Sequence, residues 1–322
     1  MTEQEMLARM KAPGDKRPGA WRGGVVQIHI TRACDKACFG CTQHSQLGGK
    51  ATFMNPDQFR QAVLSLRGFT GVYGLFGGNN ALSPHFAAYC EILKELVPFE
   101  QRGLWCNNPI TLERAQLMAT TFDPSISNLN CHLDEKAYRL FKDGWPQSRP
   151  FGLHEDSRHS PCLVAMKDVI EDEGVRNELI SRCDIGQKWS SLVGLFRGQL
   201  RAWFCEVAGS QAMLHQDEPD YPDTGIDLMP RSINPDGFAW WKMPIEVYKE
   251  QVRKHCHECS VPLRGYGELA MAEDGKEQVS KTHQAVFKPK RKGRAVELVT
   301  TLDAIKPQSL PSTTQYLQNS HR

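Results

Sequence analysis

The amino-acid sequence predicts an α/β protein, in which a partial (βα)6 parallel barrel is followed by a small C-terminal domain of a β-hairpin and a helix. Short apolar runs alternate with segments of helical spacing over residues 25–196, and a different pattern follows. Strands that alternate with helices pair in parallel through right-handed crossovers. With 322 residues, 40% hydrophobic and 24% charged, the composition is that of a globular protein with one large domain and an appendage.

Six apolar runs are expected to form the strands of this barrel. They cover residues 25–30, 71–76, 103–106, 126–133, 162–166 and 191–196. The first, Val-Val-Gln-Ile-His-Ile, is β-branched and apolar, which is typical of a buried strand. Polar residues follow the first four runs directly, and in parallel sheets the chemistry gathers at these carboxyl ends. The sequence therefore predicts one shared site at that edge.

The segments between the runs have helical patterns. Asn55 and Pro56 supply an N-cap and a first turn, and apolar residues recur at helical spacing from Phe59 to Leu66. The other helices are expected from about residue 84 to 97, and over residues 112–120, 135–141 and 175–182.

After the sixth run the pattern becomes that of a hairpin. Arg197-Gly198-Gln199 is a short glycine-containing turn between residues 192–196 and 200–207. Residues 216–234 are expected to be irregular, and residues 248–256 helical. The expected divisions are a polar N-terminal segment (1–24), the core (25–197), an auxiliary domain (198–270) and a polar, partly basic tail (271–322).

Charge and hydropathy narrow the class of protein. A formal net charge of +2 is too small to indicate nucleic-acid binding by itself, although residues 287–294 contain five basic side chains. No run of 18 apolar residues predicts a membrane span, and the first 24 residues lack the apolar core of a signal peptide. We therefore expect a cytoplasmic protein. Its eleven cysteines are then metal ligands, core residues or catalytic groups rather than disulfides.

Three cysteines lie on the loop after the first run, with the spacing Cys-x-x-x-Cys-x-x-Cys: Cys34, Cys38 and Cys41. Thiolates are soft ligands that suit iron–sulfur clusters or zinc. Three ligands on a four-iron cube leave one iron open to another molecule, which a reactive cluster requires. The alternative is a zinc site with His44 as a fourth ligand.

With this loop on the first strand of a βα repeat, the chain resembles the radical S-adenosylmethionine (SAM) superfamily over roughly residues 25–195. The resemblance implies a catalytic 4Fe–4S cluster held by Cys34, Cys38 and Cys41, with SAM on its fourth iron. It implies reductive cleavage of SAM to a 5′-deoxyadenosyl radical, which removes a hydrogen atom from the substrate. It also implies an electron donor such as flavodoxin or ferredoxin. The substrate, whether peptide, sugar or nucleotide, stays open.

The turn after the second run resembles the superfamily's Gly-Gly-Glu motif, whose backbone and carboxylate hold the methionyl amino group of SAM. Gly77 and Gly78 match, but Asn79 stands where the acid would be and brings an amide oxygen without charge. Either SAM binding is weaker or another acid helps. A second departure is Gly40, at a position before the third cysteine where the superfamily usually has an aromatic residue.

Polar residues at the later strand ends are further candidates for contacts to cofactor or substrate. Asn107, Asn130 and His132 belong to this group, as does Asp134. The alternative is that they are ordinary turn formers and helix caps.

A second set of cysteines follows the core. The region 183–259 resembles the auxiliary-cluster extensions called twitch or SPASM domains, and the shorter, single-cluster version fits better. The resemblance implies that a second 4Fe–4S cluster is bound by Cys183, Cys205, Cys256 and Cys259. The alternative is a structural zinc ion of the Cys₄ type. The isolated cysteines are expected to be small core residues: Cys90, Cys106, Cys131 and Cys162.

The leading hypothesis is therefore a radical SAM enzyme. The alternative from another class is a zinc-stabilised binding protein on a similar scaffold, which contacts nucleic acid through the basic tail. The missing acid at Asn79 is its best support. Metal content separates the two, because only the enzyme requires iron and sulfide.

Overall fold

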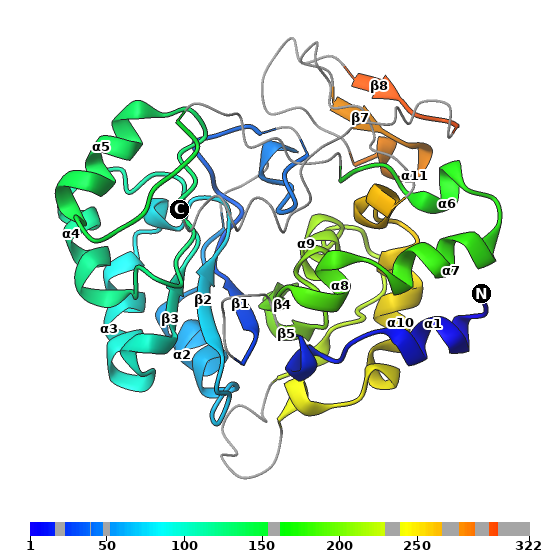
Figure 1. Cartoon of the computed structure of the whole chain (residues 1–322), viewed down its shortest axis with the longest axis horizontal. Helices are drawn as coiled ribbons and strands as arrows, with labels where there is room; N and C mark the ends of the chain where they lie inside the picture. Colours follow the sequence, from blue (N-terminus) through cyan, green and yellow to red (C-terminus); the bar gives the residue numbers. More distant parts are fainter. Residues whose placement is uncertain are drawn as a thin grey trace.

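A six-stranded sheet in the order β3-β2-β1-β4-β5-β6 forms the centre of the computed structural model (Figure 1). The structure describes residues 1–16, 23–38, 40–47, 52–153, 162–228, 239–265, 277–286 and 296–301. The strands of the sheet are β1 (Val25–His29), β2 (Val72–Phe76), β3 (Arg102–Leu104), β4 (Ser191–Phe196), β5 (Gln199–Trp203) and β6 (Ile226–Asp227). Every residue of β1 and β2 is buried, which fits the apolar runs that predicted them.

Four neighbouring strands of the sheet are parallel. β2 pairs with β3 and β1, and β1 pairs with β4, so that Val26 lies opposite Ser191. The helices α2 (Pro56–Leu64) and α3 (Phe86–Leu96) follow β1 and β2. As predicted, α2 begins after Asn55, whose side chain accepts a hydrogen bond from the Gln58 amide in a capping box.

The strand order differs from that of the predicted barrel. β4, predicted as the sixth parallel strand, pairs directly with β1, and β5 and β6 extend the sheet in antiparallel fashion. The predicted hairpin turn is present, because Arg197 and Gly198 join β4 to β5 with φ angles of 49° and 79°. The α/β class and the hairpin are therefore confirmed. The prediction of six parallel strands was wrong, because four neighbouring strands are parallel, and the hairpin is part of the main sheet.

Residues 126–133, predicted as the fourth strand, form isolated bridges instead. Asn128 bridges Trp105, but the Leu104 amide donates to the Ser127 hydroxyl (3.1 Å) where a regular ladder would use a carbonyl. Serine side chains that bond to nearby backbone compete with sheet ladders. The segment therefore pairs in parallel at Asn128, through hydrogen bonds with Leu104 and Cys106, but does not extend into the predicted strand.

Residues 162–166, predicted as the fifth strand, also lie outside the sheet. Leu163 bridges Val279 in β7 (Glu277–Val279), and the Ala165 amide donates to the Ser280 hydroxyl (2.9 Å). Val279 and Ser280 come from the predicted polar tail, yet both are fully buried. Residues 162–166 therefore form their backbone hydrogen bonds with Val279 and Ser280, late in the chain, and not with the main sheet.

Helices flank the sheet on both sides in Figure 1, with α2 to α5 on one side and α6 to α10 on the other. Besides α2 and α3, the described helices are α1 (Glu3–Arg9), α4 (Leu112–Thr121), α5 (Glu135–Gly144), α6 (Met166–Val169), α7 (Glu173–Ser181), α8 (Asp184–Lys188), α9 (Glu206–Leu214), α10 (Lys249–Gln251) and α11 (Lys281–Gln284). A π-helical turn, Val252–Cys256, continues α10. The short strand β8 (Val296–Leu298) pairs in parallel with β7.

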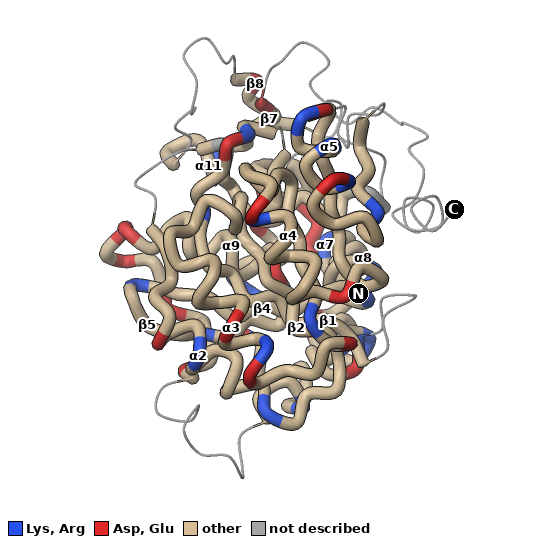
Figure 2. Tube along the Cα trace, turned by 90° about the vertical axis from the view of Figure 1, so that its left-hand side faces the viewer, with Lys and Arg blue, Asp and Glu red and all other residues tan. Residues whose placement is uncertain are grey.

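The N-terminal segment packs onto the body of the protein. α1 buries Met6 and Leu7 and packs against α7. Figure 2 shows basic and acidic residues interspersed along the described chain. The predicted basic cluster at residues 288–294 lies outside the described residues, as does Phe39 in the cysteine loop. Within the described residues, no helix has the length and apolar character of a membrane span.

Candidate active site

The cysteine loop is fixed to the end of β2 by backbone hydrogen bonds. The Gly78 amide donates to the Thr31 carbonyl (2.8 Å), and the Asn79 amide donates to the Ala33 carbonyl (2.7 Å). A β-carbon at Gly78 would lie 2.3 Å from the Ala33 oxygen, and one at Gly77 would lie 2.5 Å from the Thr31 oxygen. Only glycine permits so close an approach. The Gly-Gly turn therefore holds the backbone that precedes Cys34 against the edge of the sheet.

Three asparagine side chains converge on the carboxylate of Asp35, the residue after Cys34. The amide nitrogens of Asn79 (2.8 Å) and Asn107 (3.0 Å) donate to Oδ1, and that of Asn108 (3.0 Å) donates to Oδ2. Partial burial raises the pKa of the Asp35 carboxyl group, but the hydrogen bonds outweigh it and hold the pKa below its ordinary value. A carboxylate therefore lies beside Asn79, although position 79 itself carries no acid.

Two acceptor atoms in this group retain capacity for a ligand. Asn107 Oδ1 is buried and has no hydrogen-bond partner within the described residues. Asp35 Oδ2 accepts one side-chain hydrogen bond, and a carboxylate oxygen can accept more than one. This group of side chains therefore offers a negative charge and two acceptors to a positively charged amino group.

The polar end of residues 126–133 reaches the cysteine loop as well. Cys38 Sγ lies 3.8 Å from His132 Nδ1, and Lys36 forms an ion pair of 2.5 Å with Asp134. His132 and Leu133 have φ angles of 48° and 63°. Such a conformation costs on the order of 1 kcal/mol or more in a non-glycine residue and clusters at functional sites. The predicted convergence of strand ends is therefore present, although residues 126–133 form no regular strand.

Asn130 has a local role in this turn. Its side-chain oxygen accepts a hydrogen bond from the His132 amide (3.1 Å). It also lies against Gly152, where a β-carbon would be 2.3 Å from Asn130 Oδ1. Asn130 thus supports the turn that brings His132 to Cys38.

Gly40 joins the cysteine loop to a segment from late in the chain. Its amide donates to Glu277 Oε1 (3.2 Å), and its carbonyl accepts a hydrogen bond from the Cys162 thiol (3.1 Å). Its φ angle of 58° is readily adopted by glycine and disfavoured for an aromatic residue. The absence of an aromatic residue at this position therefore has a local structural reason. Burial raises the pKa of the neighbouring Cys41 thiol.

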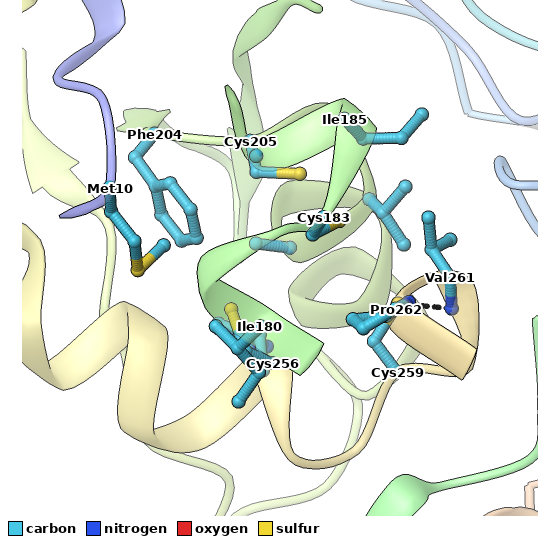
Figure 3. Close-up of a pocket in the computed structure, with 14 residues that line it drawn as sticks. Met10, Ile180, Cys183, Ile185, Phe204, Cys205, Cys256, Cys259, Val261 and Pro262 are labelled. Carbon is cyan, nitrogen blue, oxygen red and sulfur yellow. Dashed lines mark hydrogen bonds between the residues drawn. The ribbon is translucent and has the colours of Figure 1, made fainter. Parts of the chain in front are cut away.

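The four cysteines of the second set line one pocket, shown in Figure 3. Cys183 and Cys205 are the N-cap residues of α8 and α9, Cys256 ends the π-helical turn, and Cys259 follows it. Most of the remaining lining is apolar, and it includes Met10, Ile180, Phe204 and Val261. Cysteines from three separate parts of the chain therefore face the same apolar space.

The charges of this pocket are strongly coupled. Burial raises the pKa of all four thiols, and the charges of neighbouring thiolates add to this for Cys183, Cys256 and Cys259; the pKa of Cys183 is raised to about 11 by these effects together. Lys16 is fully buried and donates to the Phe204 carbonyl. Burial lowers the pKa of its ammonium group, and the charges of Cys205 and Cys183 raise it. Thiols with raised pKa are poor nucleophiles, whereas a metal cation would offset the charge of their thiolates.

Both cysteine sets have the donor chemistry of a metal site, with three thiols on one loop and four around one pocket. Among the residues that the structure describes, no three His, Cys, Asp or Glu side chains already have the separation that holds a metal ion. Metal binding therefore requires movement of side chains in either set. Such coupling between metal binding and local structure is common, because ligands must also lose their protons.

Three residues of the site had no signal of their own in the sequence: Asp35, Lys36 and Glu277. Asp35 and Lys36 lie between the first two cysteines, where they count as spacers in the motif. The clue that the sequence offered to Asp35 was indirect: the Gly-Gly turn has Asn79 where an acid was expected, and Asp35 is an acid within the cysteine loop. Glu277 lies 237 residues from its partner Gly40, a separation across which sequence patterns carry no information.

No family model and no curated protein matches this chain. Among solved structures, it is similar to BtrN in complex with AdoMet and 2-DOIA, at 11% identity and a TM-score of 0.42, over 73% of this chain and 87% of that chain. It is also similar to selenomethionine BtrN in an open conformation, at 11% identity and a TM-score of 0.41, over 73% and 86% of the two chains. At these values the structural similarity does not assign a function. The function proposed below is argued from the site residues.

Proposed function

We propose that this protein is a radical SAM enzyme in which Cys34, Cys38 and Cys41 hold a 4Fe–4S cluster that binds SAM. When bound, the cluster and SAM would supply an electron and a 5′-deoxyadenosyl radical that removes a hydrogen atom from the substrate. The observation that carries the proposal is the convergence of the Asp35 carboxylate and three asparagine amides beside the three-thiol loop. A structural zinc site requires a fourth ligand and does not need such a group of side chains.

Asp35 would bind the α-amino group of SAM in place of the acid that Asn79 lacks. An ammonium group has three donors, and Asp35 Oδ2 and Asn107 Oδ1 are acceptors with remaining capacity. Asn79 and Asn108 would keep the carboxylate ionised and oriented. The Lys36–Asp134 ion pair would fix the loop from its other side, because Asp134 is also the N-cap of α5.

The second set would hold a further 4Fe–4S cluster through Cys183, Cys205, Cys256 and Cys259. Four protein ligands leave no iron open, so this cluster would serve electron transfer or shape the substrate pocket. Lys16, buried within electrostatic range of three of these thiols, would offset part of the negative charge. A zinc ion in the same pocket is the alternative, which elemental analysis distinguishes.

Anaerobic reconstitution with iron and sulfide tests the proposal. The wild type should bind about eight irons per chain and convert SAM to 5′-deoxyadenosine when reduced by dithionite, flavodoxin or ferredoxin. Alanine at Cys34, Cys38 and Cys41 should abolish that product and about half of the iron. Cys90→Ala is the matched control, since Cys90 is a buried core cysteine outside both sets.

The substrate class stays open among peptides, sugars and nucleotides.

If the triple variant made as much 5′-deoxyadenosine as the wild type, the proposal would be refuted. One or two zinc ions per chain without iron would instead favour the zinc-stabilised binding protein. A nucleic-acid or nucleotide substrate predicts that removal of residues 288–322 lowers activity and that low salt restores it. An oxygen-sensitive cluster suits a reducing compartment such as the cytoplasm.

A further inference from the structure

We propose that three buried histidines, His44, His215 and His283, form a binding site for a divalent transition-metal ion, separate from both cysteine sets. His44 lies on the loop after Cys41, His215 follows α9, and His283 is in α11. Their exposed fractions are 0%, 5% and 0%. The proposal does not depend on the radical SAM function.

Packing brings the three segments together. Leu47, Leu163 and Val279 form one buried cluster, and Leu214 packs against it. Leu47 lies on the same short loop as His44, and Leu214 directly precedes His215. Val279 precedes α11, which carries His283. The three histidines therefore extend from segments that share one hydrophobic contact.

Ring contacts and hydrogen bonds place the histidines near one another. The ring centroids of His215 and His283 are 5.9 Å apart. With metal–nitrogen bonds of about 2.0–2.1 Å, two imidazoles on one tetrahedral ion have centroids roughly 5–6 Å apart. The Arg32 guanidinium donates to the carbonyl of His44 (3.3 Å) and to that of Met213 (3.4 Å), which ties the His44 loop to the end of α9.

Each of the three rings has at least one buried nitrogen atom without a hydrogen bond to the described residues. Within the described residues these atoms are His215 Nε2, His283 Nδ1 and both ring nitrogens of His44. Roughly nine in ten buried polar groups in proteins have a partner, so four exceptions on three neighbouring rings require an explanation. A bound ion provides one, because each of these nitrogens has a lone pair to donate when it carries no proton.

The opposite nitrogens of two rings are held as they are in metal-binding histidines. His215 Nδ1 lies 2.8 Å from Glu218 Oε1, and His283 Nε2 lies 2.7 Å from the Glu258 carbonyl oxygen. Metal ligands of this type almost always donate their second ring N–H to a carboxylate or a backbone carbonyl. Donation to these acceptors puts the free lone pairs on His215 Nε2 and His283 Nδ1, the two atoms without partners.

The donor set indicates the kind of ion. Burial lowers the pKa of His283, which favours its neutral form at neutral pH. Neutral imidazoles suit Zn²⁺ and its first-row neighbours, whereas Mg²⁺ and Ca²⁺ prefer oxygen ligands. Three protein ligands leave a tetrahedral position open to water or substrate. The Arg32 charge beside His44 opposes a cation, so we expect weaker binding than at a thiolate site.

Metal binding requires a ring to turn, since no three such side chains already have metal-holding geometry in the described part of the chain. Of the three rings, His44 is the one to which no residue in the described part of the chain makes a hydrogen bond. Its φ angle of 53° is left-handed, a conformation that a non-glycine residue retains only where its surroundings enforce it.

Zinc X-ray absorption on the full chain, with its cysteine sites first loaded with iron and sulfide, tests the site. One added equivalent of Zn²⁺ should give a nitrogen shell near ~2.0–2.1 Å and no sulfur shell near ~2.3 Å. Competition with a chromophoric chelator should show Zn²⁺ affinity lowered on the order of 100-fold in His215→Asn and His283→Asn, and about 10-fold or more in Glu218→Gln. His85→Asn, at a half-buried histidine before α3, should bind Zn²⁺ like the wild type.

A sulfur shell, no binding of Zn²⁺, or a nitrogen shell whose affinity is the same in all these variants overturns the proposal. Should the histidine variants fail to fold, Glu218→Gln decides, because the Glu218 side chain is 48% exposed and its loss is tolerable for folding. Nitrogen-bound zinc in a protein that makes no 5′-deoxyadenosine supports this site and counts only against the proposed function.

Discussion

Asp35→Asn is the sharpest test of the proposed binding of the SAM amino group, because it removes one charge and keeps the size of the side chain. In the wild type, three asparagine amides donate to the two carboxylate oxygens of Asp35. An asparagine at position 35 offers one oxygen, and its own NH₂ group would face other donors. The ammonium group of SAM would then meet a donor where it had met a carboxylate.

The expected loss follows from the number of bonds. A hydrogen bond to a charged group contributes about 1.5–3 kcal/mol, and every 1.4 kcal/mol changes an equilibrium constant about tenfold. One lost bond therefore weakens SAM binding roughly 10- to 100-fold. Asp35 is a solvent-exposed residue, so salt screens the charge of its carboxylate. The lower half of that range is therefore expected at physiological ionic strength.

Equilibrium dialysis of SAM against the anaerobically reconstituted protein measures the change. A SAM analogue without the amino group should bind wild type and Asp35→Asn alike, because the lost bond is absent from both complexes. Asp143→Asn is the control, since it removes one exposed carboxylate from the end of α5. Full iron content with a SAM Kd within about twofold of wild type would refute the role of Asp35.

Three further outcomes are expected. Gly78→Ala should halve the iron content, because its β-carbon would lie 2.3 Å from the Ala33 oxygen. Gly68→Ala is the control: its φ of 84° strains an alanine, but its β-carbon meets nothing within 4 Å, so full iron should be retained. Cys256→Ala should also lose about half of the iron and sulfide, and full retention would exclude Cys256 as a ligand. Burial lowers the pKa of His29 to about 3. The unfolded chain thus takes up a proton as pH falls from 7 to 5.5, whereas folded His29 stays neutral. Because other buried histidines with lowered pKa lose stability in the same way, urea unfolding of His29→Gln should show a loss smaller than that of the wild type by about 1 kcal/mol.

Elements with local signals were predictable from the sequence. The Asn55 cap, the apolar runs of β1 and β2, and the Arg197–Gly198 turn each depend on adjacent residues. The position of β4 beside β1 was not predictable, because strand order depends on pairings between distant segments. Residues 126–133 and 162–166 had strand-like patterns, but serine hydroxyls occupy part of their backbone hydrogen bonding.

The site shows the same division. The spacing of Cys34, Cys38 and Cys41 and the Gly-Gly turn are local motifs, and the prediction that strand ends converge on them was correct in space. The role of Asp35 depends on asparagines after two other strands, so no window of sequence contains it. The second cysteine set was inferred from a resemblance, and its members do line one pocket.

The hydrogen bond between Gly40 and Glu277 has a consequence for biosynthesis. The cysteine loop leaves the ribosome long before the segment that covers it, since 237 residues separate the two partners. At ordinary rates of translation that interval lasts roughly 10–50 s. During it the nascent loop lacks its later cover, and its thiols are open to oxidants and stray metal ions. Insertion of iron and sulfide should therefore follow release of the finished chain, and nascent chains stalled before residue 277 should hold no cluster at this loop.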